Sequence, residues 1–134
     1  MYKKQIKFSI LITFMLIMLI STNVFASSKY TRLSGEDRYE TSSKIALNGW
    51  IQCDYAVLAL GEDYPDALCA APLAGKYKAP IVLTETNSIP ASTLATIKQL
   101  QVKNTFIVGG TGVISQAVQD KLTALGITTT RLAG

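Results

Sequence analysis

Acidic side chains recur in this sequence close to where apolar runs end: Asp37, Glu62, Asp63, Asp66 and Glu85. Two carboxylates on either side of a sugar bond are the arrangement that glycosidases use for hydrolysis. Glu62 and Asp66 are therefore candidates for a hydrolytic pair. The three-residue spacing of Asp63 and Asp66 has a simpler explanation, because it matches a helix N-cap followed by an acceptor in the first turn. Capping is our preferred interpretation, and hydrolysis remains an alternative.

One basic side chain is not explained by capping. Arg38 stands in the first turn of an expected helix, where its positive charge opposes the helix dipole. The guanidinium could pair with Glu62 or Asp66, or it could meet an anionic ligand. Tyr39 and Tyr64 fit core or rim positions better than sugar-stacking positions. Both interpretations of Arg38, an ion pair and a contact to an anionic ligand, stay open.

A glycine-rich run at residues 109–112 follows an apolar run and precedes a helical pattern. Two of its glycines match part of a dinucleotide-binding fingerprint, but Ser115 stands at the third glycine position and the confirming acidic residue is absent. No cofactor is therefore expected, and a tight turn with positive φ is the preferred interpretation. The N–H groups around Gly109, Gly110 and Thr111 could still bind a phosphate or sugar oxygen.

The residue types that are missing or scarce exclude several chemistries. The chain has no His, which removes Ser-His-Asp and Cys-His nucleophilic systems and makes a zinc site improbable. Cys53 lies before an expected strand, and Cys69 lies in the helix that runs back beside it. Their expected separation exceeds the roughly 7 Å between Cα atoms that a disulfide tolerates. We expect two free and mostly buried thiols.

The elements that must position these residues alternate between strands and helices. The central unit is a buried strand at residues 55–60, a turn at 61–64, and a helix from Pro65 to about Gly75. This alternation predicts an α/β fold with a parallel sheet and helices on both faces. The other expected strands are residues 30–33, 80–83, 105–108 and 128–132, and the other expected helices are residues 37–48, one that Pro90 opens, and one from Ser115 to Gly126.

In a parallel sheet of this kind, ligands bind beyond the carboxyl ends of the strands. Four loops should meet there, at residues 35–39, 61–64, 84–88 and 109–111. No catalytic residue and no metal ligand is expected. The candidate ligand-binding residues are Asp37, Arg38, Tyr39, Glu62, Asp63, Asp66, Gly109, Gly110 and Thr111.

Residues 1–26 are interpreted as a signal peptide. Three lysines precede an apolar run at residues 8–20, which is shorter than the ~20 residues of a transmembrane helix. Small residues at Val24 and Ala26 suit cleavage after Ala26, and an uncleaved anchor is the alternative. Three of the 13 Lys and Arg lie in this segment, which leaves ten against nine Asp and Glu, a net charge of +1. The remaining chain gives no reason to expect nucleic acid, or a membrane after cleavage.

A five-residue motif occurs twice. Thr-Arg-Leu-Ser-Gly at residues 31–35 returns as Thr-Arg-Leu-Ala-Gly at residues 130–134, with a period of 99 residues. A fixed period is typical of tandem modules. Residues 27–134 therefore read as a single repeat plus the first strand of a possible next repeat, either from a truncated gene or as a unit that assembles with its own copies.

The motifs together resemble the type-2 cell wall binding repeats of Gram-positive surface proteins. This resemblance implies a Rossmann-like module, usually in three tandem copies, that attaches non-covalently to an anionic secondary polysaccharide of the wall. It further implies a secreted protein at the cell wall or cell surface that is not itself an enzyme. The matching segments are residues 32–35, 37–41, 61–68, 71–74, 79–84 and 107–111.

The sequence departs from the family in having one repeat, no effector domain, and Cys69 where the family tends to have Ala. Three weak sites gain from effective concentration and one does not. A homotrimer or packing against further repeats would compensate for this, and the alternative is that a single module is inactive. Two alternatives stay open beside the anchor: a peptidoglycan hydrolase of amidase or glycosidase type that uses Glu62 and Asp66, and an assembly module of a surface lattice.

Overall fold

The computed structural model describes Tyr2, Ile6 and residues 30–133. The expected signal peptide therefore lies outside the described residues, apart from Tyr2 and Ile6. The chain divides into two units, and the folded unit begins at Arg32. Within the described part of the chain, no helix has the length and apolar character needed to cross a membrane.

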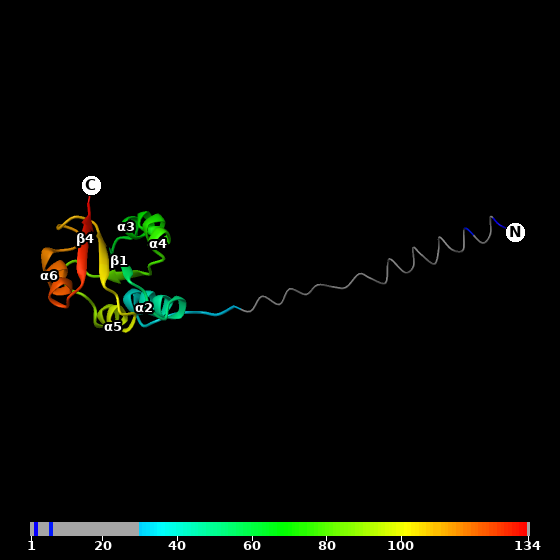
Figure 1. Ribbon diagram of the computed structural model, residues 1–134, viewed down its shortest axis with the longest axis horizontal. Helices are drawn as coiled ribbons and strands as arrows, with labels where there is room; N and C mark the ends of the chain where they lie inside the picture. The colour runs from blue at the N-terminus through cyan, green and yellow to red at the C-terminus, as the bar shows by residue number, and fades with distance from the viewer. Residues whose placement is uncertain (1, 3–5, 7–29, 134) are drawn as a thin grey trace. The chain divides into compact units, whose positions relative to one another are not determined.

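A four-stranded parallel sheet forms the centre of the folded unit (Figure 1). Its strands are β1 (Tyr55–Leu60), β2 (Ile81–Thr84), β3 (Asn104–Val108) and β4 (Thr128–Leu132), in the spatial order β2-β1-β3-β4. β1 is buried along almost its whole length, as its continuous apolar run predicts. The α/β class and the parallel sheet are confirmed.

Helices cover both faces of the sheet (Figure 1). On one face, Leu58 of β1 packs in a core with Ala46, Ile97 and Leu122, which come from three different helices. On the other face, Val57 packs against a smaller cluster of alanines that keeps two short helices close to the sheet. The helices are α2 (Arg38–Gly49), α3 (Tyr64–Cys69), α4 (Ala71–Tyr77), α5 (Ala91–Gln99) and α6 (Gln116–Ala124).

The expected strand at residues 30–33 is wrong, because these residues have no regular secondary structure. The position beside β3 belongs to β4, which carries the second copy of the same Thr-Arg-Leu sequence. A sheet edge holds one strand, so in a single chain only one of the two copies pairs there.

The helix expected from Pro65 to about Gly75 is two helices. Pro72 has no N–H, and its ring would clash with the carbonyl group of Leu68, so α3 ends at Cys69 and α4 starts anew at Ala71. α4 then runs past Gly75 to Tyr77 and ends at Lys78, which has a φ of +49°. Pro65 lies in the first turn of α3, as predicted.

Both cysteines are free, as predicted. Cys53 is partly buried, and this burial, helped by the negative charge of Asp54, raises the pKa of its thiol. The expectation of burial is wrong for Cys69, which is exposed on α3. A six-residue helix at the margin of the sheet does not have enough neighbours to enclose every side.

Candidate functional site

The carboxyl ends of the strands meet at one edge of the sheet. The ladder continues one residue past the strands, since Gly61 N–H donates to Thr84 O over 2.9 Å and Gly109 N–H donates to Leu132 O over 2.8 Å. The loops that follow β1 and β3 therefore begin at the same level. We call this edge, with the start of α2, the strand-end site.

Arg38 joins the start of α2 to the loop after β1. Its Nη1 donates to Gly61 O over 2.7 Å, and the side chain is otherwise exposed. No ion pair links Arg38 to Glu62 or Asp66 in the described part of the chain. A carbonyl oxygen thus positions the guanidinium without neutralising its charge, and the remaining N–H groups stay open to a ligand.

Tyr39 lies directly on Gly61. A Cβ atom added to Gly61 would fall 2.5 Å from Cε1 of Tyr39, a distance that only glycine avoids. Partial burial raises the pKa of the Tyr39 hydroxyl, and the negative charges of Glu62 and Glu85 raise it further, with Arg38 acting against them. Tyr39 therefore lies where α2 meets the loops after β1 and β2, as expected of a rim aromatic.

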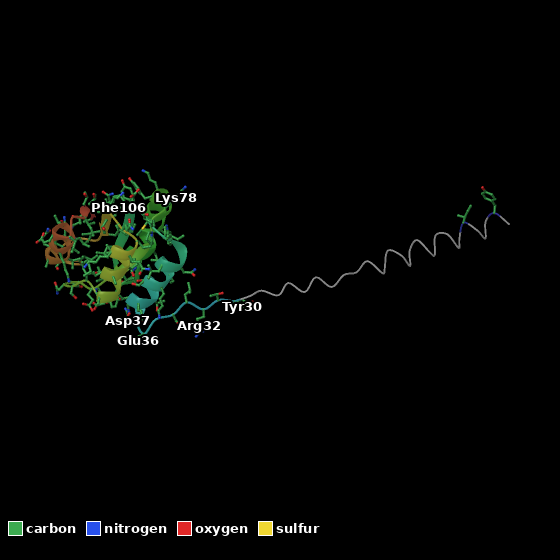
Figure 2. All side chains as sticks on the ribbon, turned by 60° about the horizontal axis from the view of Figure 1, so that its bottom comes forward. Tyr30, Arg32, Glu36, Asp37, Lys78 and Phe106 are labelled. Atoms are coloured by element: carbon green, nitrogen blue, oxygen red, sulfur yellow. The ribbon has the colours of Figure 1, made fainter. Side chains whose placement is uncertain are left out.

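Asp37 caps α2, which confirms the interpretation from spacing. Its Oδ1 accepts from Glu40 N–H over 2.7 Å, and its carbonyl accepts from the Thr41 hydroxyl over 2.7 Å. Glu40 in turn accepts from Glu36 N–H over 2.6 Å, and this bond, followed by Lys44, lowers the pKa of the Glu40 carboxyl. Figure 2 shows Glu36 and Asp37 side by side at this end of the molecule.

The other carboxylates have different roles from the expected caps. Asp63 occupies the N-cap position of α3, but its side chain makes no capping hydrogen bond and is exposed. Asp66 is half-buried and points toward the loop after β3, since a Cβ atom on Gly109 would lie 3.1 Å from its Oδ2. Glu62 is exposed. Asp66 thus brings the loop after β1 next to the loop after β3.

The glycine loop after β3 is a turn, as expected. Gly109 has a φ of +115°, in the region that favours glycine. Gly110 O accepts from the N–H groups of Val113 and Ile114, each over 3.0 Å. Because α6 begins only at Gln116, Gly110 and Thr111 precede the helix rather than open it. Their N–H groups belong to the turn and not to the positive end of the helix dipole.

The sequence did not predict the role of Arg131, which holds together the loop after β3 and the start of α6. From β4 it donates to Gly109 O over 2.9 Å, to Ile114 O over 2.8 Å and to Ser115 O over 3.5 Å, and its Nε donates to Gln119 Oε1 over 3.1 Å. Four acceptors from one loop and the helix after it therefore converge on a single half-buried side chain. The available signal was an arginine in a Thr-rich strand that returns in both copies of the repeated motif.

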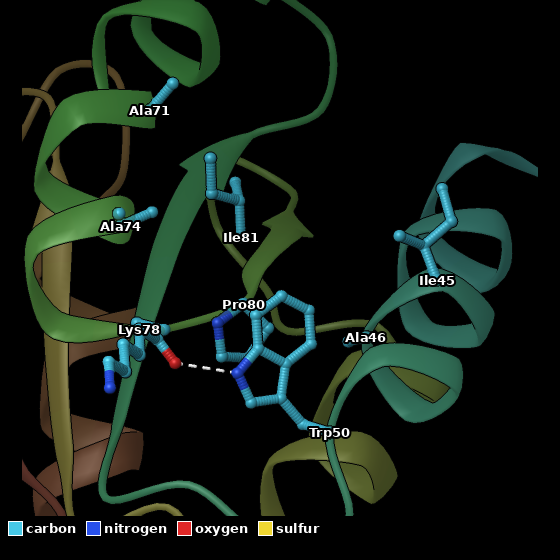
Figure 3. A pocket seen from close by; sticks show the side chains of 10 residues that line it. Ile45, Ala46, Trp50, Ala71, Ala74, Lys78, Pro80 and Ile81 are labelled. Carbon is cyan, nitrogen blue, oxygen red and sulfur yellow. Dashed lines mark hydrogen bonds between the residues drawn. The ribbon is translucent and has the colours of Figure 1, made fainter.

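An apolar groove of about 380 Å³ lies away from the strand-end site, between α2 and α4 (Figure 3). Trp50 ends α2 there, and its Nε1 donates to Lys78 O over 2.7 Å. Pro80 directly precedes β2 and Ile81 is its first residue, whereas the strand-end site adjoins its last residue. The groove is therefore a separate surface. Its remaining lining comes from Ile45, Ala46, Ala71, Ala74, Gly75 and Ala79.

The electrostatic character of the strand-end site is mixed. Besides the Arg38 guanidinium, the loops and helix starts at this edge carry five carboxylates, those of Asp37, Glu62, Asp63, Asp66 and Glu85, of which Asp37, Glu62 and Glu85 raise the pKa of Tyr39. Across residues 30–133, no three His, Cys, Asp or Glu side chains converge in the way a metal ion requires. The site thus offers one guanidinium, several carboxylate acceptors and a tyrosine ring, which suits a hydroxyl-rich ligand with sparse negative charge.

Comparison with known proteins identifies the family. The model of Cell wall binding domain 2 (CWB2) matches residues 32–119, about two thirds of the chain. The chain belongs to the CWB2 family. The resemblance seen in the sequence motifs is thereby confirmed, and the matched region covers the candidate ligand-binding residues from Asp37 to Thr111 and excludes β4.

Relatives of this CWB2 domain are much longer proteins. N-acetylmuramoyl-L-alanine amidase LytC of Bacillus subtilis is 33% identical over 121 residues, which are 90% of this chain and 24% of LytC. The amidase enhancer of Bacillus subtilis is 32% identical over 95 residues, 71% of this chain and 14% of that protein. Cwp6 from Clostridium difficile superimposes with a TM-score of 0.73 at 32% identity, over 84% of this chain and 19% of Cwp6. The chain spans about a quarter or less of each.

Membership in CWB2 indicates cell wall binding, and the solved relative confirms the α/β fold. The match to LytC covers only the part of that amidase that resembles a binding domain. Nothing in the similarity therefore transfers amidase chemistry to this chain.

Proposed function

We propose that this chain is a secreted, non-catalytic module that holds itself to the cell wall by binding an anionic secondary polysaccharide. The observation that carries the proposal is the exposed Arg38 guanidinium, which Gly61 O fixes at 2.7 Å on the rim of the strand-end site. The protein would then be located at the cell wall or cell surface, as are cell-wall-associated members of CWB2.

Arg38 is suited to an anionic group because its orientation is set before the ligand arrives. One Nη1–H bond to a carbonyl restricts the side chain, so less rotamer entropy is lost on binding than for a free surface arginine. The other N–H groups can form a two-point contact with a phosphate or carboxylate. The N–H groups near Asp63 and Gly110 would add contacts to sugar oxygens.

The role of the neighbouring carboxylate of Glu62 can be tested by neutralising it and measuring whether ligand binding becomes stronger or weaker. Glu62 is exposed and next to the loop that holds Arg38, so it repels an anionic group that approaches the guanidinium. If Glu62 mainly opposes the anion, its neutralisation strengthens binding. If Glu62 mainly accepts hydrogen bonds from sugar hydroxyls, its neutralisation weakens binding.

The experiment measures retention of the chain from Ser27 onward, which carries the whole folded unit, on purified walls before and after acid extraction of the secondary polymer. We expect retention to depend on the polymer. Arg38→Ala should weaken it by roughly ten- to hundredfold, since a hydrogen bond to a charged group contributes ~1.5–3 kcal/mol. Glu62→Gln should strengthen it at low salt. Lys98→Ala is the matched control, because it removes an exposed charge from the last turn of α5.

Unchanged retention of Arg38→Ala would remove Arg38 from the site, and retention after polymer extraction would remove the polymer as ligand. Release of reducing ends or free amines from peptidoglycan, lost in Glu62→Gln and Asp66→Asn, would instead favour the hydrolase. Molecular mass in solution, measured on the same samples, tests whether copies assemble as a homotrimer or as a lattice module.

A further inference from the structure

The edge of the sheet beside β3 is built to hold an arginine-bearing strand. β4 pairs with β3 in parallel register, with Thr130 opposite Phe106, Arg131 opposite Ile107 and Leu132 opposite Val108. Gly109 N–H closes the pairing on Leu132 O. We call this edge, with the acceptors of the loop after β3, the strand receptor.

Arg131 gives the strand receptor its selectivity. Its guanidinium satisfies the carbonyl groups of Gly109, Ile114 and Ser115, which are backbone atoms and so remain in place whatever strand occupies the edge. The side chains of β4 on the other side of the strand are exposed and contribute less. An incoming strand with Thr-Arg-Leu in register would therefore recover the contacts that Thr130, Arg131 and Leu132 make.

The chain carries a second segment with the same Thr-Arg-Leu sequence, and this segment does not pair with the sheet. Residues 31–35 match residues 130–134 at four of five positions, including Thr, Arg and Leu in the same order. Residues 30–33 form no strand, and Arg32 is exposed on the segment that precedes α2 (Figure 2). Each copy of the chain thus has one strand receptor and two segments whose Thr-Arg-Leu sequence fits it, namely β4 and residues 30–33.

We propose that the strand receptor of one copy binds residues 30–33 of a second copy, with Arg32 in the place of Arg131. The register then sets Thr31 opposite Phe106, Arg32 opposite Ile107 and Leu33 opposite Val108, and Gly109 N–H donates to Leu33 O. The partner is a second copy of this chain, because the chain itself supplies the matching sequence. This inference does not depend on the polymer that the strand-end site binds.

Replacing β4 by residues 30–33 of a second copy keeps the contacts that the Thr-Arg-Leu sequence makes with the strand receptor, so the balance between own and foreign strand depends on protein concentration. β4 has the advantage of being attached to α6 by a short connection, which gives it a high effective concentration at its own receptor. Weakening β4 without altering residues 30–33 should therefore favour the foreign strand. The same substitution at the two motif arginines should have opposite effects.

The first test measures molecular mass against concentration for the chain from Ser27 onward and its variants. Arg131→Ala should self-associate at concentrations at least tenfold lower than the wild type, because three receptor carbonyls lose their donor and Arg32 of a second copy restores it. Arg32→Ala should associate less than the wild type. The double variant should be monomeric, and Lys98→Ala should match the wild type.

The second test uses a synthetic peptide of residues 28–35, labelled for fluorescence anisotropy. It should bind Arg131→Ala and compete with its self-association, whereas the peptide with Arg32→Ala should bind at least tenfold more weakly. If Arg131→Ala does not fold, Arg131→Lys keeps the charge without the planar fork and serves in its place. A folded variant that binds no peptide overturns the proposal, as does association that persists in the double variant.

Discussion

Two glycines determine how closely side chains approach the backbone at the strand-end site. Gly61 lets the Tyr39 ring lie against the loop after β1, and Gly109 lets the Asp66 carboxylate lie against the loop after β3. In both places a methyl group would occupy space that a side chain already fills. The glycines thus allow α2 and α3 to bring Arg38 and Asp66 to the same edge of the sheet.

Gly109→Ala should destabilise the domain by about 1–3 kcal/mol, because its φ of +115° is strained for any residue with a Cβ atom. The new methyl group would also lie 3.1 Å from Asp66 Oδ2 and from Val113 Cγ1. Gly112→Ala in the same loop is the control, since no atom lies within 4 Å of the added Cβ. Denaturant midpoints measure both. Equal effects in the two variants would show that loop entropy, rather than local geometry, decides the cost.

The sequence was sufficient to predict contacts between residues that are close together in the chain. The spacing of Asp37 and Glu40 predicted the cap on α2, and the glycine run predicted the positive φ at Gly109. The sequence did not predict the hydrogen bond in which the Ser42 hydroxyl accepts from Leu83 N–H, 41 positions away, or the hydrogen bonds that Arg131 donates. Partners so distant in the chain meet only after the sheet has formed, and no spacing rule encodes them.

Among the elements, α2 depends on a contact at its far end from the strand-end site. Trp50 ends the helix and donates from Nε1 to Lys78 O, in the connection between α4 and β2. This bond ties elements that cover opposite faces of the sheet across the edge at β2 (Figure 3). It therefore helps to fix the direction in which α2 points Arg38 at Gly61.

Trp50→Phe should lower the free energy of unfolding by about 1–2 kcal/mol, since it removes the indole donor and part of the ring while leaving Lys78 O without that partner. Ile51→Ala is a suitable control, because Ile51 is 97% exposed and directly follows Trp50. Thermal or denaturant unfolding gives both values. If Trp50→Phe were as stable as Ile51→Ala, the bond would add nothing that water does not supply.

Predictions at the level of elements succeeded where hydrophobic pattern and length were sufficient. The continuous apolar run of β1 and the helical spacing of Val118 and Leu122 in α6 both correspond to observed elements. The break between α3 and α4 was missed because the alanine-rich pattern continues through Pro72. The strand expected at residues 30–33 is wrong although its Thr-Arg-Leu sequence is the same as that of β4, which occupies the edge beside β3.

At the scale of the whole molecule, the repeated motif predicts how two such modules could be joined in a longer chain. The motif at residues 31–35 leads directly into α2, and its second copy forms β4. In a chain where Glu36 of a second module follows Gly134, one motif would serve both as β4 of the first module and as the entry to α2 of the next. Such a joint keeps the strand receptor filled and places a second strand-end site at a fixed distance.

A tandem chain built with this joint should be retained on purified walls more strongly than the single module, by up to a factor of about 10²–10⁴, because the second site binds at an effective concentration rather than from solution. A tandem with Arg38→Ala in one module is the matched control, and its retention should fall back toward that of the single module. Retention measured on the same walls at equal numbers of modules compares them. Equal retention of one module and two has two explanations. If the joint prevents both sites from binding at once, a longer linker should raise the retention of the tandem chain. If retention does not depend on the strand-end site, Arg38→Ala should leave the retention of both chains unchanged.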